Sequence, residues 1–392
     1  MSPTLRHNPV AQYIVVTASY WAFTLSDGAL RMLVVLFFHE LGYSPLEVAS
    51  LFILYEFFGM VTNLFGGWLA SRIGLNMTMS AGLFLQIAAL AMLLAEPSML
   101  TIPYVMLAQA LSGIAKDLNK MSAKSSIKAL VKDDGGLYRW VALLTGSKNT
   151  LKGAGFFLGG ALLAAWGFRG AITTLLILLI TAFVLSAILL EQRAGVASFK
   201  PKFLDIFSKS AAINRLSAAR FFLFASRDIW FVVALPVYLQ SQLGWTYLAV
   251  GSLLAGWMIA YGAIQALAPR ITGSKPDGSI AYIWAAILTL LPTAIGLALL
   301  FEWHIQTMLV LGLLVFGAVF AINSSVHSYL IVAWARQDGV SLDVGFYYMA
   351  NAAGRLVATI LSGLIYQQWG LAACLFGSAV FVLCSALLAR KL

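Results

Sequence analysis

Charged residues and cysteines are scarce in this chain. Asp, Glu, Lys and Arg make up 10% of its 392 residues, whereas 61% are apolar. Soluble domains carry about 25% charged residues, so this composition indicates a protein whose solvent is a lipid bilayer. The two cysteines, Cys374 and Cys384, share one apolar segment and indicate neither a disulfide framework nor a thiolate metal site.

Motifs of enzymes are also lacking. The sequence contains no phosphate-binding glycine loop, no H-E-x-x-H string and no Cys/His cluster. No nucleophile, base and orienting group converge in any motif. We therefore expect no enzymatic activity, no cofactor and no metal.

What the chain does contain is a series of apolar runs, each long enough to cross a membrane. Only helices and closed barrels satisfy the backbone in lipid, and the ten-residue alternation typical of barrel strands is absent. The sequence thus predicts an all-α membrane protein of twelve spanning helices, with both termini on one side. The expected spans are 10–38, 46–70, 75–95, 101–119, 138–165, 170–190, 216–240, 246–268, 280–301, 305–333, 344–367 and 370–389.

Positive charge between the spans indicates the orientation. Sixteen Lys and Arg residues fall on the side of the termini, and one, Arg169, falls on the other. Because cations concentrate in cytoplasmic loops, both termini are expected in the cytoplasm. The net charge of +10 is therefore mostly topological, and we expect no nucleic-acid partner.

The two halves of the chain repeat each other. A shift of about 202 positions lays LGYSPLEVASLF at 41–52 over LGWTYLAVGSLL at 243–254, and Asp27 over Asp228. A shift of 203 pairs Lys152 with Arg355 and Trp166-Gly167 with Trp369-Gly370. This pattern predicts two pseudo-symmetric six-helix halves, 1–190 and 216–392, joined by a cytoplasmic linker at 191–215.

Such symmetry resembles that of the major facilitator superfamily, whose substrate site lies at the midplane between two rocking halves. The superfamily's loop signature after the second span, G-x-x-x-D-[RK]-x-G, corresponds to positions 67–74, where Ser71 replaces the usual Asp. A gating ion pair at this loop is therefore not expected.

Eight fixed charges lie near the middle of apolar segments. A charge at a helix centre costs roughly 2.5 to 3.5 kcal/mol, so eight facing lipid would cost on the order of 20 kcal/mol. They must therefore face one another, water or a substrate. Five of the eight are positive, which favours a path for an anion. The eight are Asp27, Arg31, Glu56, Lys148, Lys152, Arg227, Asp228 and Arg355.

Spacing suggests how some of these charges pair. Asp27 and Arg31 lie four apart on one helix face, so an ion pair between them is geometrically easy, whether structural or functional. Arg227 and Asp228 are adjacent and about 100° apart around a helix, so they are not expected to satisfy each other well, and at least one is expected to reach another helix. Lys148 and Lys152 are four residues apart and share a helix face. Their ammonium groups repel each other unless an anion or a carboxylate lies between them.

Further polar residues complete the predicted site. Lysines at 116, 120, 124, 128 and 132 form a stripe on one helix face. From 124 onward we expect this face to lie at the membrane interface, whereas Lys116 and Lys120 lie deeper and are expected to belong to the substrate pathway. His327 serves either as a coupling group or as a hydrogen-bonded fixture. Gly155 and Gly159 indicate close helix packing. The predicted substrate-binding residues are Arg31, Lys116, Lys120, Lys148, Asn149, Lys152, Arg227, Asn323, Asn351 and Arg355, and the predicted proton-coupling or ion-pair residues are Asp27, Glu56, Asp117, Asp228 and His327.

Four strings resemble the organoarsenical efflux permeases of bacterial arsenic-resistance operons: YWAFTLSDGALRM at 20–32, LYEFFG at 54–59, SGIAKDLNKMSAKSS at 112–126 and LTGSKNTLKGAGFFLGG at 144–160. The resemblance implies a monomeric, multi-pass transporter of the bacterial inner membrane. It implies proton-coupled export of 1-arseno-3-phosphoglycerate by alternating access, arsenate resistance, and a functional link to a glyceraldehyde-3-phosphate dehydrogenase that makes this ester.

Two other functions stay open at this stage. The same cations would serve a transporter of another organophosphate or organic anion. A sensor that uses the fold without transport is the alternative from a different class. The scarcity of cysteine favours a pentavalent arsenate ester, which offers oxygens, over trivalent arsenic, which seeks clustered thiolates.

Overall fold

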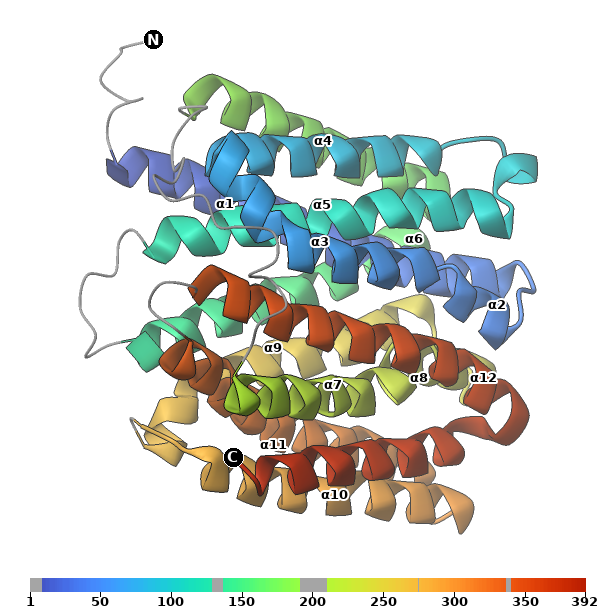
Figure 1. The fold of residues 1–392 in the computed structure, drawn as a ribbon. Helices are drawn as coiled ribbons and strands as arrows, with labels where there is room; N and C mark the ends of the chain where they lie inside the picture. Colours follow the sequence, from blue (N-terminus) through green and yellow to red (C-terminus); the bar gives the residue numbers. More distant parts are fainter. Residues whose placement is uncertain (1–8, 129–136, 191–209, 274, 336–339) are drawn as a thin grey trace.

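The computed structural model describes residues 9–128, 137–190, 210–273, 275–335 and 340–392, and the regular elements in these ranges are helices (Figure 1). A single 3₁₀ turn, Pro97–Met99, precedes α5. The α-helices are α1 (Pro9–Glu40), α2 (Pro45–Ser50), α3 (Ile53–Ile73), α4 (Leu75–Met92), α5 (Ile102–Lys128), α6 (Leu137–Leu189), α7 (Ala211–Phe231), α8 (Ala234–Ser241), α9 (Tyr247–Thr272), α10 (Gly278–Leu300), α11 (Ile305–Trp334) and α12 (Val340–Ala389).

Nine stretches in the described ranges are long and apolar enough to cross a membrane. Two of them are double crossings, because α6 and α12 leave helical geometry at Gly167 and Gly370, where φ is 63° and 76°. Figure 1 shows α12 turning back on itself at the end opposite the C-terminus. Helix α5 holds the charges at 116, 117 and 120 and therefore falls outside the apolar set, although its 27 residues suffice to span a bilayer.

These crossings agree with the twelve predicted spans. The predicted second span is divided into α2 and α3, and the seventh into α7 and α8. Helix α7 begins at Ala211, five residues before the predicted start of its span, because Ser210 caps it by accepting a hydrogen bond from the backbone N–H of Ile213. Helix α1 begins at the same end of the bundle at which the chain ends (Figure 1), as an even number of crossings requires.

Backbone geometry confirms the internal repeat. The six glycines with positive φ in the described ranges form three pairs: Gly42 with Gly244, Gly74 with Gly273, and Gly167 with Gly370. Helix caps repeat as well, since Ser44 and Thr246 both accept a hydrogen bond from the backbone N–H three residues later. Turns and caps thus recur about every 200 residues, as two copies of one six-helix unit predict.

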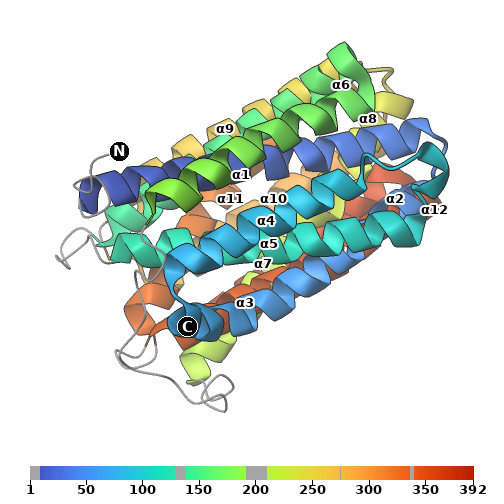
Figure 2. The same cartoon turned by 90° about the horizontal axis from the view of Figure 1, so that it is seen from above.

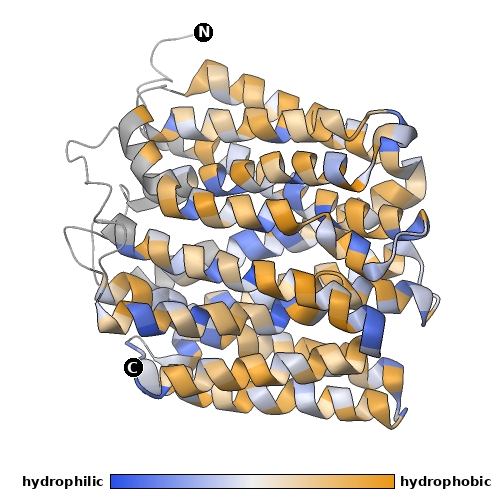
Figure 3. Ribbon diagram, turned by 45° about the vertical axis from the view of Figure 1, so that its right-hand side comes forward, coloured by the Kyte–Doolittle hydropathy of each residue, from blue (hydrophilic) through white to orange (hydrophobic). Residues whose placement is uncertain are grey.

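The helices of the first half meet those of the second along two seams. Helix α6 packs against α9, and α3 packs against α12 (Figure 2). Small residues bring the first seam together: a Cβ on Gly153 would lie 2.7 Å from the carbonyl oxygen of Ala255, and one on Gly160 would lie 2.7 Å from that of Tyr247. Apolar residues dominate the helix surfaces, while hydrophilic residues gather at helix ends and inside the bundle (Figure 3).

Candidate functional site

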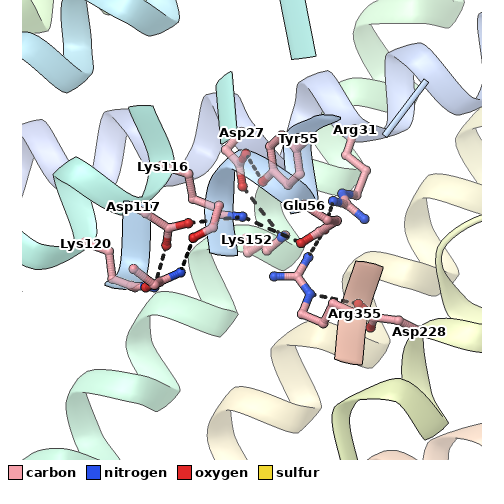
Figure 4. Close-up of polar contacts among 12 residues, drawn as sticks. Asp27, Arg31, Tyr55, Glu56, Lys116, Asp117, Lys120, Lys152, Asp228 and Arg355 are labelled. Carbon is pink, nitrogen blue, oxygen red and sulfur yellow. Dashed lines mark hydrogen bonds and ion pairs between the residues drawn. The ribbon is translucent and has the colours of Figure 1, made fainter. Parts of the chain in front are cut away.

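Ten charged side chains from six helices form one cluster inside the bundle, which we call the central cluster; Figure 4 labels its members apart from Arg227. It contains six cations and four carboxylates, and each cation lies within 4.0 Å of a carboxylate oxygen. The cluster therefore carries a net charge of two positive. Its members are Asp27 and Arg31 of α1, Glu56 of α3, Lys116, Asp117 and Lys120 of α5, Lys152 of α6, Arg227 and Asp228 of α7, and Arg355 of α12.

Two ion pairs of the central cluster are related by the internal repeat. In the first half, Lys152 Nζ lies 3.6 Å from Asp27 Oδ2. In the second half, Arg355 Nε donates to Asp228 Oδ2 at 2.8 Å. Each half therefore pairs a carboxylate on its first helix with a cation on its fifth span, as the predicted correspondence of these positions requires.

Glu56 joins the two halves. Its Oε1 accepts a hydrogen bond from Arg31 Nη2 of its own half at 2.9 Å and another from Arg355 Nη2 of the other half at 2.5 Å. Lys116 Nζ lies 3.9 Å from Glu56 Oε2. The carboxylate side chain is fully buried, so these charge-assisted bonds hold in a medium of low dielectric constant.

The predicted pair between Asp27 and Arg31 is wrong. Asp27 accepts a hydrogen bond from the Tyr55 hydroxyl at 2.6 Å and pairs with Lys152, while Arg31 turns to Glu56. The two side chains lie four apart on α1, yet α3 and α6 offer closer and better-aligned partners. Partner choice between neighbouring helices has overridden the local spacing.

The prediction for Arg227 and Asp228 is half correct. Asp228 does reach another helix, because it accepts from Arg355 of α12. The two adjacent residues nevertheless satisfy each other well, since Arg227 Nε and Nη2 lie 2.6 Å and 2.5 Å from Asp228 Oδ1. The long guanidinium side chain bends back and spans the 100° between the two positions.

Helix α5 adds a second, lysine-rich part to the central cluster. Lys120 forms an ion pair with Asp117 and donates to Asn63 of α3, and Lys116 Nζ lies 3.7 Å from Asp117 Oδ2. Lys116 also lies 4.0 Å from the centre of the Tyr55 ring. The deeper lysines of the predicted stripe thus belong to the cluster, whereas the side chains at 124, 128 and 132 lie outside the described residues.

Five of the six cations of the central cluster are more exposed to solvent than any of its carboxylates, and the exception is Arg31, at 5%. The side chains of Lys116, Lys152 and Arg355 are 13–15% exposed, and that of Arg227 is 11% exposed. The carboxylates of the cluster are 0–1% exposed, apart from Asp27 at 7%. A solute entering the bundle therefore meets positive charge first, which is the arrangement that attracts an anion.

Other predicted residues occupy different places. Lys148 is half-buried on α6, one turn from Lys152. Asn149 donates from Nδ2 to Gln265 Oε1 of α9 at 2.7 Å and so links the two halves. Asn351 is buried one turn before Arg355 on α12.

Asn323 and His327 are fully buried on α11, and neither the Asn323 amide nor the His327 ring nitrogens have a hydrogen-bond partner among the described residues. Of the two alternatives for His327, the hydrogen-bonded fixture therefore has no support among the described residues. A separate prediction, at the altered loop signature, falls on Ser71, whose side chain lies outside the described residues.

Sequence reasoning missed several polar residues near the central cluster. Arg220, buried on α7, donates from Nη1 to the backbone carbonyl of Ser324 at 3.0 Å and to its hydroxyl at 3.1 Å. Gln265 of α9, which accepts the hydrogen bond from Asn149, was missed as well. The signal for Arg220 was available, because it lies seven residues before Arg227 on the same predicted span and hence on nearly the same helix face.

Metal binding has no support in the part of the chain that the structure describes. No three His, Cys, Asp or Glu side chains there gather so as to hold a metal ion. The two cysteines are not joined to each other, and both lie on α12 beyond Gly370. The groups available to a ligand are thus ammonium, guanidinium, amide and hydroxyl donors, which suit oxyanions.

Comparison with known proteins agrees with this architecture. The family model of the major facilitator superfamily matches residues 16–275 and 216–392. The crystal structure of the human organic anion transporter MFSD10 (TETRAN) is similar in fold, with a TM-score of 0.70 and 16% sequence identity over 99% of this chain and 100% of that one. A search of curated proteins finds no match. The chain belongs to the major facilitator superfamily and is a membrane transporter.

Proposed function

We propose that this transporter exports 1-arseno-3-phosphoglycerate across the bacterial inner membrane and thereby confers resistance to arsenate. The central cluster is the observation that carries the proposal, because its cations exceed its carboxylates by two and four of these cations have side chains that are 11–15% exposed. The ester bears a phosphate at one end and an arsenate group at the other. Cations from both halves meet in the cluster, which suits the oxygens of such an anionic end.

Binding proceeds by exchange of partners. Without substrate, buried carboxylates hold each cation and avoid the cost of an unpaired charge in the membrane. An incoming oxyanion takes the exposed ends of Lys152, Lys116 and Arg355, each charged hydrogen bond contributing about 1.5 to 3 kcal/mol. Arginine grips two oxygens at once, while lysine acts as a point charge.

The bond between Glu56 and Arg355 connects this exchange to movement of the halves. Arg355 divides its donors between Glu56 of the first half and Asp228 of the second. An anion that binds Arg355 weakens the hydrogen bond between Arg355 and Glu56. The contact between α3 and α12 is then weaker. Substrate binding thereby lowers the barrier to the rocking motion of alternating access.

Asp27 is the carboxylate best placed to exchange a proton. Of the predicted candidates Asp27, Glu56 and Asp228, it is the one whose side chain reaches solvent, with 7% exposed against 0% and 1%. The ion pair between Asp27 and Lys152, at 3.6 Å, is also longer than the corresponding pair of the second half, Asp228 with Arg355, at 2.8 Å. After the anion has left on the outer side, Asp27 takes up a proton there and releases it to the cytoplasm when it pairs with Lys152 again, which resets the cavity.

Lys152→Gln tests the proposal in cells that express the dehydrogenase. Loss of the ammonium group removes one of the exposed cations, so arsenate resistance should fall to the level of cells without the transporter. Lys152→Arg keeps the charge and should restore part of the resistance. Arg390→Gln, at an exposed position beyond α12, is the matched control and should leave resistance unchanged.

Membrane abundance is measured for every variant by immunoblot. Full resistance in cells with normal amounts of Lys152→Gln would remove Lys152 from the substrate site.

A transporter of an ordinary organophosphate is the second candidate, because the central cluster recognises oxygens and contains no group that prefers arsenic. Transport of 3-phosphoglycerate at a rate equal to or above that of the arsenate ester would favour it. Purified protein that moves neither anion in liposomes would favour a sensor.

A further inference from the structure

Arg220 differs from every cation of the central cluster. It is 3% exposed, and it has no carboxylate partner among the described residues. Its Nη1 donates to Ser324, while Nε has no partner. A buried guanidinium with neither a counter-ion nor full hydrogen bonding is costly, which makes it a candidate for contact with a ligand.

Polar groups without hydrogen-bond partners lie within three residues of Arg220 on α7 or of its partner Ser324 on α11. Asn323 and His327 flank Ser324 on α11, and Ser217 lies three residues before Arg220 on α7. All three side chains are at most 2% exposed and lack hydrogen-bond partners in the described ranges. Amide, hydroxyl and imidazole N–H groups can all donate to oxygen. Together with Arg220 Nε they make up a set of buried groups that can donate a hydrogen bond and that lack a partner among the described residues.

Contacts with the Phe224 ring limit the distance between the Arg220 guanidinium and that of Arg227, a member of the central cluster. The guanidinium carbon of Arg220 lies 4.0 Å from the centre of the Phe224 ring, and that of Arg227 lies 4.9 Å from it. The two distances sum to 8.9 Å, which is the largest separation that the two carbons can have. Two cations within that separation match two anionic groups joined by a short carbon chain.

We propose that Arg220, Asn323, His327 and Ser217 form a second anion subsite, which takes the far anionic group of a substrate whose near group lies at the central cluster. The inference rests on the proposed function and narrows its substrate class to molecules with two anionic groups, at least one of them a tetrahedral oxyanion. Arg227 belongs to the near group's site and Phe224 contacts the carbon chain between the two groups.

The subsite is closed in this structure and connected to the seam between the halves. Ser324 Oγ, which holds Arg220, accepts hydrogen bonds from the Tyr261 hydroxyl at 3.1 Å and from Gln265 Nε2 at 3.3 Å. Gln265 in turn accepts from Asn149 of the first half. Rocking of the halves that stretches this last bond would release Gln265 and Ser324 and open the way to Arg220.

Binding of two stable probes by the purified full-length protein tests the proposal. 3-Phosphoglycerate carries two anionic groups, whereas glycerol 3-phosphate carries the phosphate alone on the same carbon chain. Calorimetric titration should show tighter binding of 3-phosphoglycerate by the wild type. Arg220→Gln should weaken 3-phosphoglycerate by about tenfold or more, the loss typical of one charged hydrogen bond, and leave glycerol 3-phosphate within about twofold.

Asn323→Leu provides a second variant that does not depend on the folding of Arg220→Gln. Replacing a buried amide that has no partner with an apolar group of similar size should leave the thermal unfolding temperature unchanged or higher. The same variant should weaken 3-phosphoglycerate selectively. The subsite would be overturned if both variants bound the two probes with equally reduced affinity. It would also be overturned if neither variant bound either probe more weakly than the wild type.

Lys152→Gln separates this outcome from failure of the proposed function. It should weaken both probes, because it acts on the near group. Failure of the wild type to bind either probe would reject the anion site as a whole, and the subsite with it.

Discussion

Glu56→Gln is the substitution whose effects follow most directly from the contacts in the structure. The substitution keeps the shape of the side chain and one acceptor oxygen but removes the charge that Arg31 and Arg355 share. Removing one partner of a buried ion pair costs about 3 to 5 kcal/mol. Because the amide oxygen still accepts hydrogen bonds, we expect a loss near 3 kcal/mol, a large part of the 5 to 15 kcal/mol that stabilises a typical domain.

The same change should make the protein more responsive to anions. With Glu56 neutral, the central cluster has three carboxylates for its six cations, and an added anion no longer competes with the carboxylate for Arg355. Phosphate should therefore raise the thermal unfolding temperature of Glu56→Gln by more than it raises that of the wild type, since stabilisation grows with ligand affinity.

Tryptophan fluorescence during heating of the purified protein, with and without phosphate, measures both effects. Glu302→Gln, at an exposed position between α10 and α11, is the matched control and should behave as the wild type. Unchanged unfolding of Glu56→Gln without phosphate would refute the shared ion pair. Equal stabilisation of the variant and the wild type by phosphate would refute the exchange between carboxylate and anion.

Two further predictions concern packing and the seam. Gly159→Ala should destabilise the protein by about 1 to 3 kcal/mol, because its Cβ would lie 2.5 Å from the carbonyl oxygen of Ala29. Gly256→Ala, with open space around the added Cβ, should leave the stability unchanged. Thermal unfolding of the two variants compares these effects. Asn149→Leu should cost about 1 to 3 kcal/mol by leaving the Gln265 amide oxygen unsatisfied, and Gln265→Leu in the same chain should recover most of that loss in a double-mutant cycle.

The fold could be predicted from the sequence because the signals that specify it are local or periodic. Apolar runs give the helices, and a repeat of about 202 residues gives the two halves. The turns at Gly167 and Gly370 need a residue that tolerates positive φ, and each glycine follows a tryptophan at corresponding positions.

Membership of the central cluster could also be predicted, since a charge in an apolar segment must avoid lipid. The partners within the cluster could not. Arg31 turns away from Asp27 because α3 presents Glu56 at 2.9 Å, and no spacing along α1 contains that information. Glu56 has no charged counterpart in the repeat, where Met258 stands 202 residues later, so symmetry could not reveal its bond across the halves.

Transport by the purified protein tests the central claim most directly. Wild-type protein is placed in liposomes, and dehydrogenase, glyceraldehyde 3-phosphate, arsenate and NAD are supplied outside. The account predicts that arsenic accumulates inside only when the dehydrogenase is active, and that Lys152→Gln abolishes the accumulation. Entry of arsenic into liposomes with folded wild-type protein no faster than into empty liposomes would contradict it.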